Sequence, residues 1–316
     1  MRWYSSTLNK ILLILPTLLV YLVYIIAPIF IAAYYSFTKF SGIGQPQLVG
    51  LSNYARLLKD PLFIIALKNT IIVLVVTIAI LIPGAFLLSM LMNRNIKGLG
   101  IVRAINYAPS IIAPIMVGLI WVFILDPHIG LVNVFLNKIG LSSMALEWIG
   151  GDKLTPFSVA IVQSWQSLGY IATIFLAGLT LIPDELYEAA DIDGASPFQK
   201  MMTITIPMLN ETFKMNLILV ITLVFKIFET VLQLTNGGPN HLSEVLVTYM
   251  YSTTFTSGEY GYGMSIAVVT LIFTFLCAGI IFGGFTVVKK IRNKNTNQKE
   301  MEDIKTKTLN REGGKV

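Results

Sequence analysis

The chain has 316 residues, of which 55% are hydrophobic and only 13% are charged. An ordinary soluble domain carries about 25% charged residues, so this composition excludes a soluble globular protein and predicts a membrane protein with several spans. The net charge of +6 does not indicate nucleic-acid binding, because nine of the 23 basic residues follow the last apolar segment.

Six apolar segments are long enough to span a bilayer, which requires roughly 20 apolar residues per helix. None of them shows the alternating pattern of membrane strands, so the predicted fold class is an all-α membrane protein with six transmembrane helices. The first segment is longer than the apolar core of a signal peptide and lacks a small-residue cleavage site, so we expect it to be retained. The segments cover about residues 11–37, 69–92, 105–125, 156–182, 213–234 and 264–288.

The distribution of basic residues predicts the orientation, since cytoplasmic loops are enriched in Lys and Arg. The run after the last segment places the C-terminus in the cytoplasm, and six spans then place residues 1–10 there too. The loop 235–263 has no Lys or Arg, which agrees with an outer position. We expect one membrane domain at 11–290 and a polar, basic cytoplasmic tail at 291–316 that is disordered or a frayed helix. The first outer loop is an exception, with Lys39, Arg56, Lys59 and Lys68.

The fourth segment carries polar side chains close to helical spacing for one face, with an indole nearby. Polar groups inside a span usually face a cavity or a partner helix. Amides, hydroxyls and an aromatic ring suit a sugar. Two other interpretations stay open, namely hydrogen bonding between helices and an interfacial anchor at Trp165. The residues are Gln163, Trp165, Gln166, Tyr170 and Thr173.

The loop between the fourth and fifth segments is predicted to form two short helices separated by a sharp turn. Pro183 is suited to start the first helix and Gly194 to end it. Ser196 and Gln199 form a capping box for the second helix, which Pro207 is expected to limit. Acidic side chains on this loop are able to pair with Arg or Lys of a soluble partner, and a merely solvated loop is the alternative. They are Glu188, Asp191 and Asp193.

The fifth segment again has polar residues on one helical face. A lysine near the middle of a span is rare. Lys226 and Glu229 are three residues apart, so one interpretation is an ion pair within the helix. The other is that Lys226 meets an anionic substrate, such as an acidic oligosaccharide or a sugar phosphate. The face comprises Thr222, Lys226, Glu229, Thr230 and Gln233.

Motifs for chemistry are missing from the sequence. There is no Gly-x-x-x-x-Gly-Lys-Ser/Thr phosphate loop, so we expect any ATP hydrolysis to occur on another chain. His128 and His241 have no Cys or carboxylate cluster at metal-ligand spacing, so no metal site is predicted. No nucleophile–base arrangement stands out. A membrane enzyme that uses Lys226 and Glu229 therefore has no motif in its favour, and no catalytic residue is predicted.

The loop after the fourth segment resembles the signature of the membrane subunits of ATP-binding-cassette (ABC) importers. Its spacing is Glu188-Ala189-Ala190, three residues, Gly194, nine residues, Ile204, one residue, a branched aliphatic residue and Pro207. The sequence departs from the family pattern at Ile206, where Leu is commoner. The resemblance implies a coupling helix that docks in a groove of an ATPase subunit. The coupling residues that it implies are Glu188, Ala189, Ala190, Asp191, Asp193, Gly194, Ile204 and Pro207.

The resemblance covers roughly residues 11–290, with the coupling loop at 183–212. Residues 162–183 look like the fourth helix of the carbohydrate-uptake branch of the family. The stretch Leu234-Thr235-Asn236-Gly237-Gly238-Pro239 looks like an outer loop of the same branch. The chain is thus similar to the first permease of maltose, lactose and multiple-sugar transporters. This similarity implies the permease fold of type I ABC importers.

The same resemblance implies a function. It describes a transport subunit in the plasma membrane of a bacterium that forms half of a sugar (oligosaccharide) pathway by alternating access. The implied partners are a second homologous permease, two ATPase subunits that bind ATP and Mg²⁺, an extracytoplasmic solute-binding protein, membrane lipid and the sugar. This chain itself is expected to bind no cofactor. The alternatives are a permease for glycerol phosphate or another solute, and an ion-coupled secondary carrier, which needs no ATPase.

Overall fold

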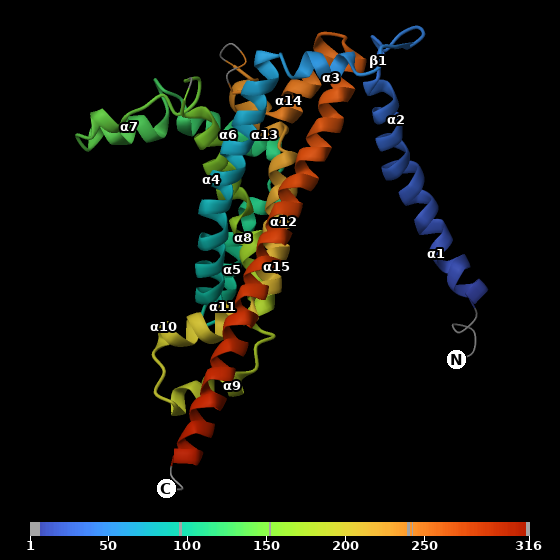
Figure 1. The fold of residues 1–316 in the computed structure, drawn as a ribbon. Helices are drawn as coiled ribbons and strands as arrows, with labels where there is room; N and C mark the ends of the chain where they lie inside the picture. Colours follow the sequence, from blue (N-terminus) through green and yellow to red (C-terminus); the bar gives the residue numbers. More distant parts are fainter. Residues whose placement is uncertain (1–6, 95–96, 152, 239–240, 242, 314–316) are drawn as a thin grey trace.

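The computed structural model describes residues 7–94, 97–151, 153–238, 241 and 243–313, and this part of the chain is almost entirely helical (Figure 1). Four of its helices are long and apolar enough to cross a membrane, and the number rises to six if each of two bent helix pairs is one span. The predicted all-α fold class is confirmed. The predicted N-terminal segment, outer-loop motif and tail extend into residues 1–6, 239 and 314–316, which lie outside the described residues.

The first span is a nearly continuous helix that diverges from the others. It consists of α1 (Thr7–Tyr21), the π-helical η2 (Leu22–Ile26) and α2 (Ala27–Ser36). None of its most apolar window is buried, and Figure 1 shows α1 lying apart from the bundle. A helix that is apolar on all sides needs apolar neighbours. Lipid or another protein chain must therefore cover it.

A short hairpin and a helix follow the first span. Strands β1 (Thr38–Lys39) and β2 (Gln47–Leu48) pair antiparallel, with Thr38 opposite Leu48. Helix α3 (Ser52–Leu57) comes next. The side-chain amide of Asn53 donates hydrogen bonds to the carbonyls of Ser36 and Thr38, at 2.8 and 2.9 Å. These bonds hold α3 against the end of α2.

The core of the bundle is the long contact between α4 (Pro61–Met92) and α8 (Thr155–Leu179). The rings of Phe86 and Phe175 meet across this contact with centroids 5.8 Å apart, and both helices also carry fully buried alanines, Ala85 and Ala172. Helix α4 begins at Pro61, so the predicted start at residue 69 is wrong. Asp60 caps the helix by accepting a hydrogen bond from the amide of Leu62 at 2.9 Å, and a proline suits the first helical position.

The third and fifth predicted spans are not continuous helices. The third divides into α5 (Leu99–Ile111) and α6 (Pro114–Leu125), bent by 98°. Pro114 explains this break, because the residue before a proline avoids the α-helical region. The fifth divides into α12 (Asn210–Phe225) and α13 (Glu229–Thr235). Here a lysine follows the C-terminus of α12 and a glutamate begins α13, an arrangement that both helix dipoles favour.

The remaining elements connect and extend these spans. Helix α15 (Tyr260–Gly313) is helical far beyond the last apolar segment, so the backbone of the basic tail is helical as far as Gly313. Figure 1 shows α7 projecting to one side at the top, while α9 and α10 lie at the opposite end of the molecule. The connecting elements are α7 (Leu131–Lys138), η3 (Ser142–Met144), α9 (Asp184–Ile192), α10 (Pro197–Lys200), η4 (Met201–Thr205), α11 (Ile206–Met208), α14 (Leu246–Tyr251) and η5 (Ser252–Thr256).

Candidate functional site

The loop between α8 and α12 has the local structure that its sequence predicts. Gly194 follows α9 with φ +75°, in the left-handed region that glycine adopts readily. A Cβ atom at this position meets nothing within 4 Å, so glycine serves the backbone conformation and not close packing. Ser196 and Gln199 form the predicted capping box, with hydrogen bonds of 2.7 and 3.3 Å. The turn between the two helices is therefore well defined.

The second helix ends at Met208, one residue after Pro207, so the predicted limit at Pro207 agrees with the structure to within one residue. The helical path runs from α10 through the π-helical η4 and into α11, and Pro207 lies inside α11. A π-helical turn just before the proline accommodates the hydrogen bond that proline is unable to donate. The helical path ends at Met208 and then bends by 66° into α12.

Two side-chain contacts join separate parts of this loop. Lys200 forms an ion pair with Asp191 at 2.6 Å, which joins α10 to α9. The hydroxyls of Tyr187 and Thr205 lie 3.0 Å apart, within hydrogen-bond distance. Asp191 is thus already paired within the chain. Both contacts connect the parts of the loop within the chain itself.

The exposed surface of the loop contains large apolar side chains that the sequence analysis did not identify. Ile192 is 88% exposed and Phe198 is 64% exposed. Glu188 and Asp193 are exposed beside them, whereas Ile204 packs against the core. Apolar groups within a charged surface are typical of a protein-docking site. An isoleucine at the end of a polar helix, just before a glycine turn, is the signal that would have predicted it.

A pocket of about 450 Å³ lies where both broken helices are interrupted. Its walls come from α5 and α8, from the break between α5 and α6, and from the break between α12 and α13. Breaks of this kind place backbone groups and polar side chains at membrane depth, where they line a cavity. The pocket contains six residues of the two predicted polar faces, which are Gln163, Gln166, Tyr170, Lys226, Glu229 and Thr230.

Four other predicted residues do not line this pocket. Trp165 contacts Trp121 edge to face, with ring centroids 5.5 Å apart. The hydroxyls of Thr173 and Thr222 donate hydrogen bonds to carbonyls one turn earlier in their own helices. Gln233 packs against Gly118, where a Cβ would come within 2.5 Å of the glutamine Cβ. Trp165 and Gln233 therefore contribute to helix packing, whereas the two threonine hydroxyls bond within their own helices.

The two glutamines of the pocket already have hydrogen-bond partners. The amide nitrogen of Gln166 donates to the carbonyl of Ile112 at 3.0 Å, and Ser110 donates to the carbonyl of Gln166 at 2.8 Å. Both contacts hold the break between α5 and α6. Gln163 donates to the hydroxyl of Ser167 at 2.9 Å within α8. Gln166 is therefore a positioning residue, and it also faces the cavity.

The charged side chains of the pocket do not form the predicted intrahelical ion pair. The break between α12 and α13 separates Lys226 from Glu229. Across the described residues, the ion pairs are Arg56–Glu259, Lys200–Asp191, Lys214–Glu211 and His241–Glu244, and neither pocket charge takes part. Both side chains are exposed. They stay available to a ligand or to a second chain.

A polar network at the far end from α9 was not predicted. The carboxylate of Asp60 accepts hydrogen bonds of 2.5 Å from the hydroxyls of Tyr249 and Tyr262. Burial raises the pKa of Asp60, but these bonds and those from the amides of Leu62 and Phe63 outweigh it and hold the pKa below its usual value. The network joins α4, α14 and α15. Its members are up to 202 residues apart in the sequence.

Comparisons with known proteins agree with this architecture. A family described as "Binding-protein-dependent transport system inner membrane component" matches residues 82–288. The chain is 36% identical over 271 residues to the probable ABC transporter permease protein YurN of Bacillus subtilis (strain 168), covering 84% of this chain and 93% of that protein. It is 34% identical over 273 residues to the arabinooligosaccharides transport system permease protein AraP of the same organism, covering 85% and 86%.

A solved structure has a closely similar fold. It is titled as the crystal structure of a bacterial ABC transporter involved in the import of the acidic polysaccharide alginate. The TM-score is 0.75 at 22% sequence identity, and the match covers 91% of this chain and 99% of the other. At this level of identity the match shows a shared fold and leaves the cargo of this chain open.

Proposed function

This chain belongs to the family of binding-protein-dependent transport system inner membrane components, and from that premise we propose that it is the permease subunit of an ATP-driven oligosaccharide importer. It is a multi-pass protein of the plasma membrane. The observation that carries the proposal is the polar pocket at the two helix breaks, because buried polar groups between spans mark a solute pathway. The relative AraP, named as an arabinooligosaccharides permease and 34% identical to this chain, supports the substrate class.

The coupling step takes place on the loop between α8 and α12. Glu188, Ala189 and Asp193 face outward on α9 and its turn, and Ile192 and Phe198 supply apolar contacts to a cytoplasmic ATPase subunit. Ala190, Asp191, Gly194, Ile204 and Pro207 shape the loop. ATP and Mg²⁺ bind to two ATPase subunits, which close and reopen. Their motion draws the docked helices together and switches the permease between inward-open and outward-open forms.

The permease acts together with a homologous second permease and a solute-binding protein. The apolar window of the first span is not buried within this chain. This exposure supports a second protein chain packed against it in the membrane. The binding protein delivers sugar to the end of the bundle that carries the Asp60 network. Both termini lie in the cytoplasm, in line with the basic tail. Each permease then contributes half of the pathway.

The pocket binds sugar hydroxyls through polar side chains. Tyr170 supplies an aromatic ring and a hydroxyl, and Gln163 and Thr230 supply further polar groups. Lys226 and Glu229 add one charge of each sign. Because they are not paired with each other, each is able to discriminate between neutral and charged sugars.

A variant of the exposed face of α9 tests the proposal. We expect Glu188→Lys to abolish ATP-dependent sugar uptake while the protein still reaches the membrane at the normal level. Lys138→Glu on α7, at the opposite end of the molecule, is the charge-reversal control and should leave the ATPase subunits bound to the permease, whereas Glu188→Lys should release them. Normal uptake by Glu188→Lys would contradict the coupling role of α9. Release of the ATPase subunits by both variants would show that charge reversal alone is harmful.

A further inference from the structure

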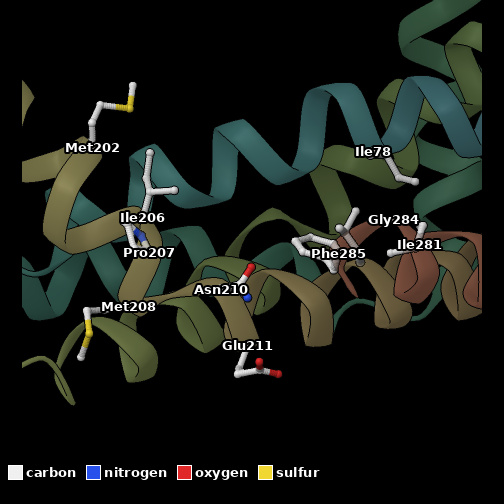
Figure 2. A pocket seen from close by; sticks show the side chains of 11 residues that line it. Ile78, Met202, Ile206, Pro207, Met208, Asn210, Glu211, Ile281, Gly284 and Phe285 are labelled. Atoms are coloured by element: carbon white, nitrogen blue, oxygen red, sulfur yellow. The ribbon is translucent and has the colours of Figure 1, made fainter. Parts of the chain in front are cut away.

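A second cavity is unrelated to the pocket at the helix breaks. It is an apolar groove of about 830 Å³ whose lining comes from α4, η4, α11, α12 and α15. Figure 2 shows Ile281, Gly284 and Phe285 of α15 at one end of the groove and Met202 and Ile206 at the other. Sites for small ligands commonly measure about 300–1,000 Å³ and have mostly apolar walls. The groove is therefore large enough for a specific ligand.

The groove lies on a different side of α12 from the pocket. Leu217 lines the groove, whereas Leu223 and Lys226 line the pocket. Leu217 and Leu223 are six residues apart, and in a helix with 3.6 residues per turn their side chains lie on faces roughly 120° apart. A solute in the pocket is therefore separated from the groove by α12 itself. Any occupant of the groove therefore differs from the transported sugar.

The position of the groove indicates an apolar occupant from the membrane. Its α15 residues, Ile281 to Phe285, lie in the last turns of the candidate span Tyr260–Thr286. Met202 and Met208 remain about half exposed along it. Flexible methionine side chains adapt to irregular apolar partners. An acyl chain fits these walls, because no polar partner is required along most of its length.

Basic residues that follow the groove in the sequence favour an anionic headgroup. Glu211 borders the groove, and its charge is compensated by an ion pair of 2.7 Å with Lys214. The Lys214 ammonium lies 5.7 Å from the ring centre of Phe285. The sequence then places a basic cluster directly after Phe285, in the continuing helix: Lys289, Lys290, Arg292 and Lys294. Basic clusters just beyond a membrane helix attract anionic lipids.

We propose that this groove is a binding site for an anionic phospholipid. One acyl chain occupies the groove between α4, α12 and α15, and the phosphate lies beside the basic cluster that begins at Lys289. The site does not depend on which solute the permease carries. A protein helix is the competing occupant, and the basic cluster favours lipid over it.

Two adjacent glycines of α15 provide a matched test. A Cβ atom at Gly283 or Gly284 meets nothing within 4 Å, so both positions accept a larger residue without a clash at Cβ. Only Gly284 lines the groove. Gly284→Leu therefore fills the groove, and Gly283→Leu adds the same side chain outside it. The assembled transporter is purified with each variant and mixed with phosphatidylglycerol or phosphatidylcholine. Native mass spectrometry then measures how much of each lipid stays bound.

We expect the wild type and Gly283→Leu to retain phosphatidylglycerol in preference to phosphatidylcholine, and Gly284→Leu to lose it. Lys289→Gln and Arg292→Gln should each weaken retention of phosphatidylglycerol by about fivefold without changing that of phosphatidylcholine. Equal retention by the two glycine variants, or no preference between the lipids, would overturn the proposal. Release of the second permease from the Gly284→Leu complex would also overturn it and would identify the groove as a protein interface.

Discussion

The side-chain amide of Gln166 donates a hydrogen bond of 3.0 Å to the backbone carbonyl of Ile112, 54 residues earlier in the chain. That carbonyl lies at the break between α5 and α6, where the regular helical hydrogen bonds stop. A carbonyl released from the helical pattern at membrane depth needs another hydrogen-bond donor, and the Gln166 amide supplies one. Gln166 thereby stabilises the bend that forms one wall of the pocket.

Removing this amide should destabilise the protein. Gln166→Leu leaves the Ile112 carbonyl without its donor, at a cost of about 1–3 kcal/mol, and should lower the melting temperature of the purified complex. Gln163→Leu is the control, because Gln163 bonds only to Ser167 within α8. Thermal unfolding in detergent measures both variants. Equal melting temperatures for the two would contradict the role of Gln166 at the break.

The unpaired charge of Lys226 should affect charged sugars selectively. Lys226→Met removes a cation from the pocket without leaving an ion-paired partner behind, since Lys226 is in none of the ion pairs of the described residues. Loss of a hydrogen bond to a charged group weakens binding by about 10- to 100-fold. We expect uptake of an acidic sugar to fall by this factor and uptake of a neutral sugar to persist. Equal loss of uptake for the acidic and the neutral sugar, or no loss for either sugar, would refute charge recognition by Lys226.

The exposed apolar anchor on the α9 loop should contribute strongly to ATPase binding. Ile192→Asp places a charge where we expect a buried contact, and removal of a central anchor typically weakens an interface by about 2 kcal/mol, or about 30-fold. Co-purification of the ATPase subunit with the permease measures this. Ile129→Asp, another apolar residue that is 70% exposed, is the control outside the loop. Undiminished ATPase recovery with Ile192→Asp would exclude Ile192 from the interface.

The Asp60 network should make stability depend on pH in the acid range. The pKa of Asp60 is lowered in the folded protein, so its stabilising effect is complete above the unfolded value of about 3.9 and is lost as the pH falls through the folded value. The melting temperature of the wild type should fall more steeply below about pH 4 than that of Asp60→Asn. Parallel pH profiles from pH 7 to 3 would contradict this role for Asp60.

Features that depend on neighbouring residues could be predicted from the sequence. The capping box of Ser196 and Gln199 and the turn at Gly194 rest on contacts within a few residues, and both are present. The apolar segments were recognisable because a membrane span needs length and apolar composition alone. The polar face of α8 was also recognised, and three of its residues line the pocket.

Features that depend on distant partners could not be predicted. The break at Ile112 is held by Gln166 from another helix, and the hydroxyl of Tyr249 reaches Asp60 across 189 residues. The break after Phe225 did leave a local signal, because Lys226 and Glu229 have the charges that suit a helix end and a helix start. Because the fifth segment was assumed to be one continuous helix, this signal was missed and an intrahelical ion pair was predicted instead.

Sugar uptake into vesicles tests the transport function most directly. The chain is reconstituted with its second permease, its binding protein and the sugar that this protein retains, either with or without the ATPase subunits and with ATP supplied on the ATPase side. We predict accumulation only when the ATPase and ATP are both present, and none with Gly194→Asp, which strains the turn after α9. Uptake that persists without the ATPase, driven by an ion gradient, would contradict the assignment as an ABC importer permease.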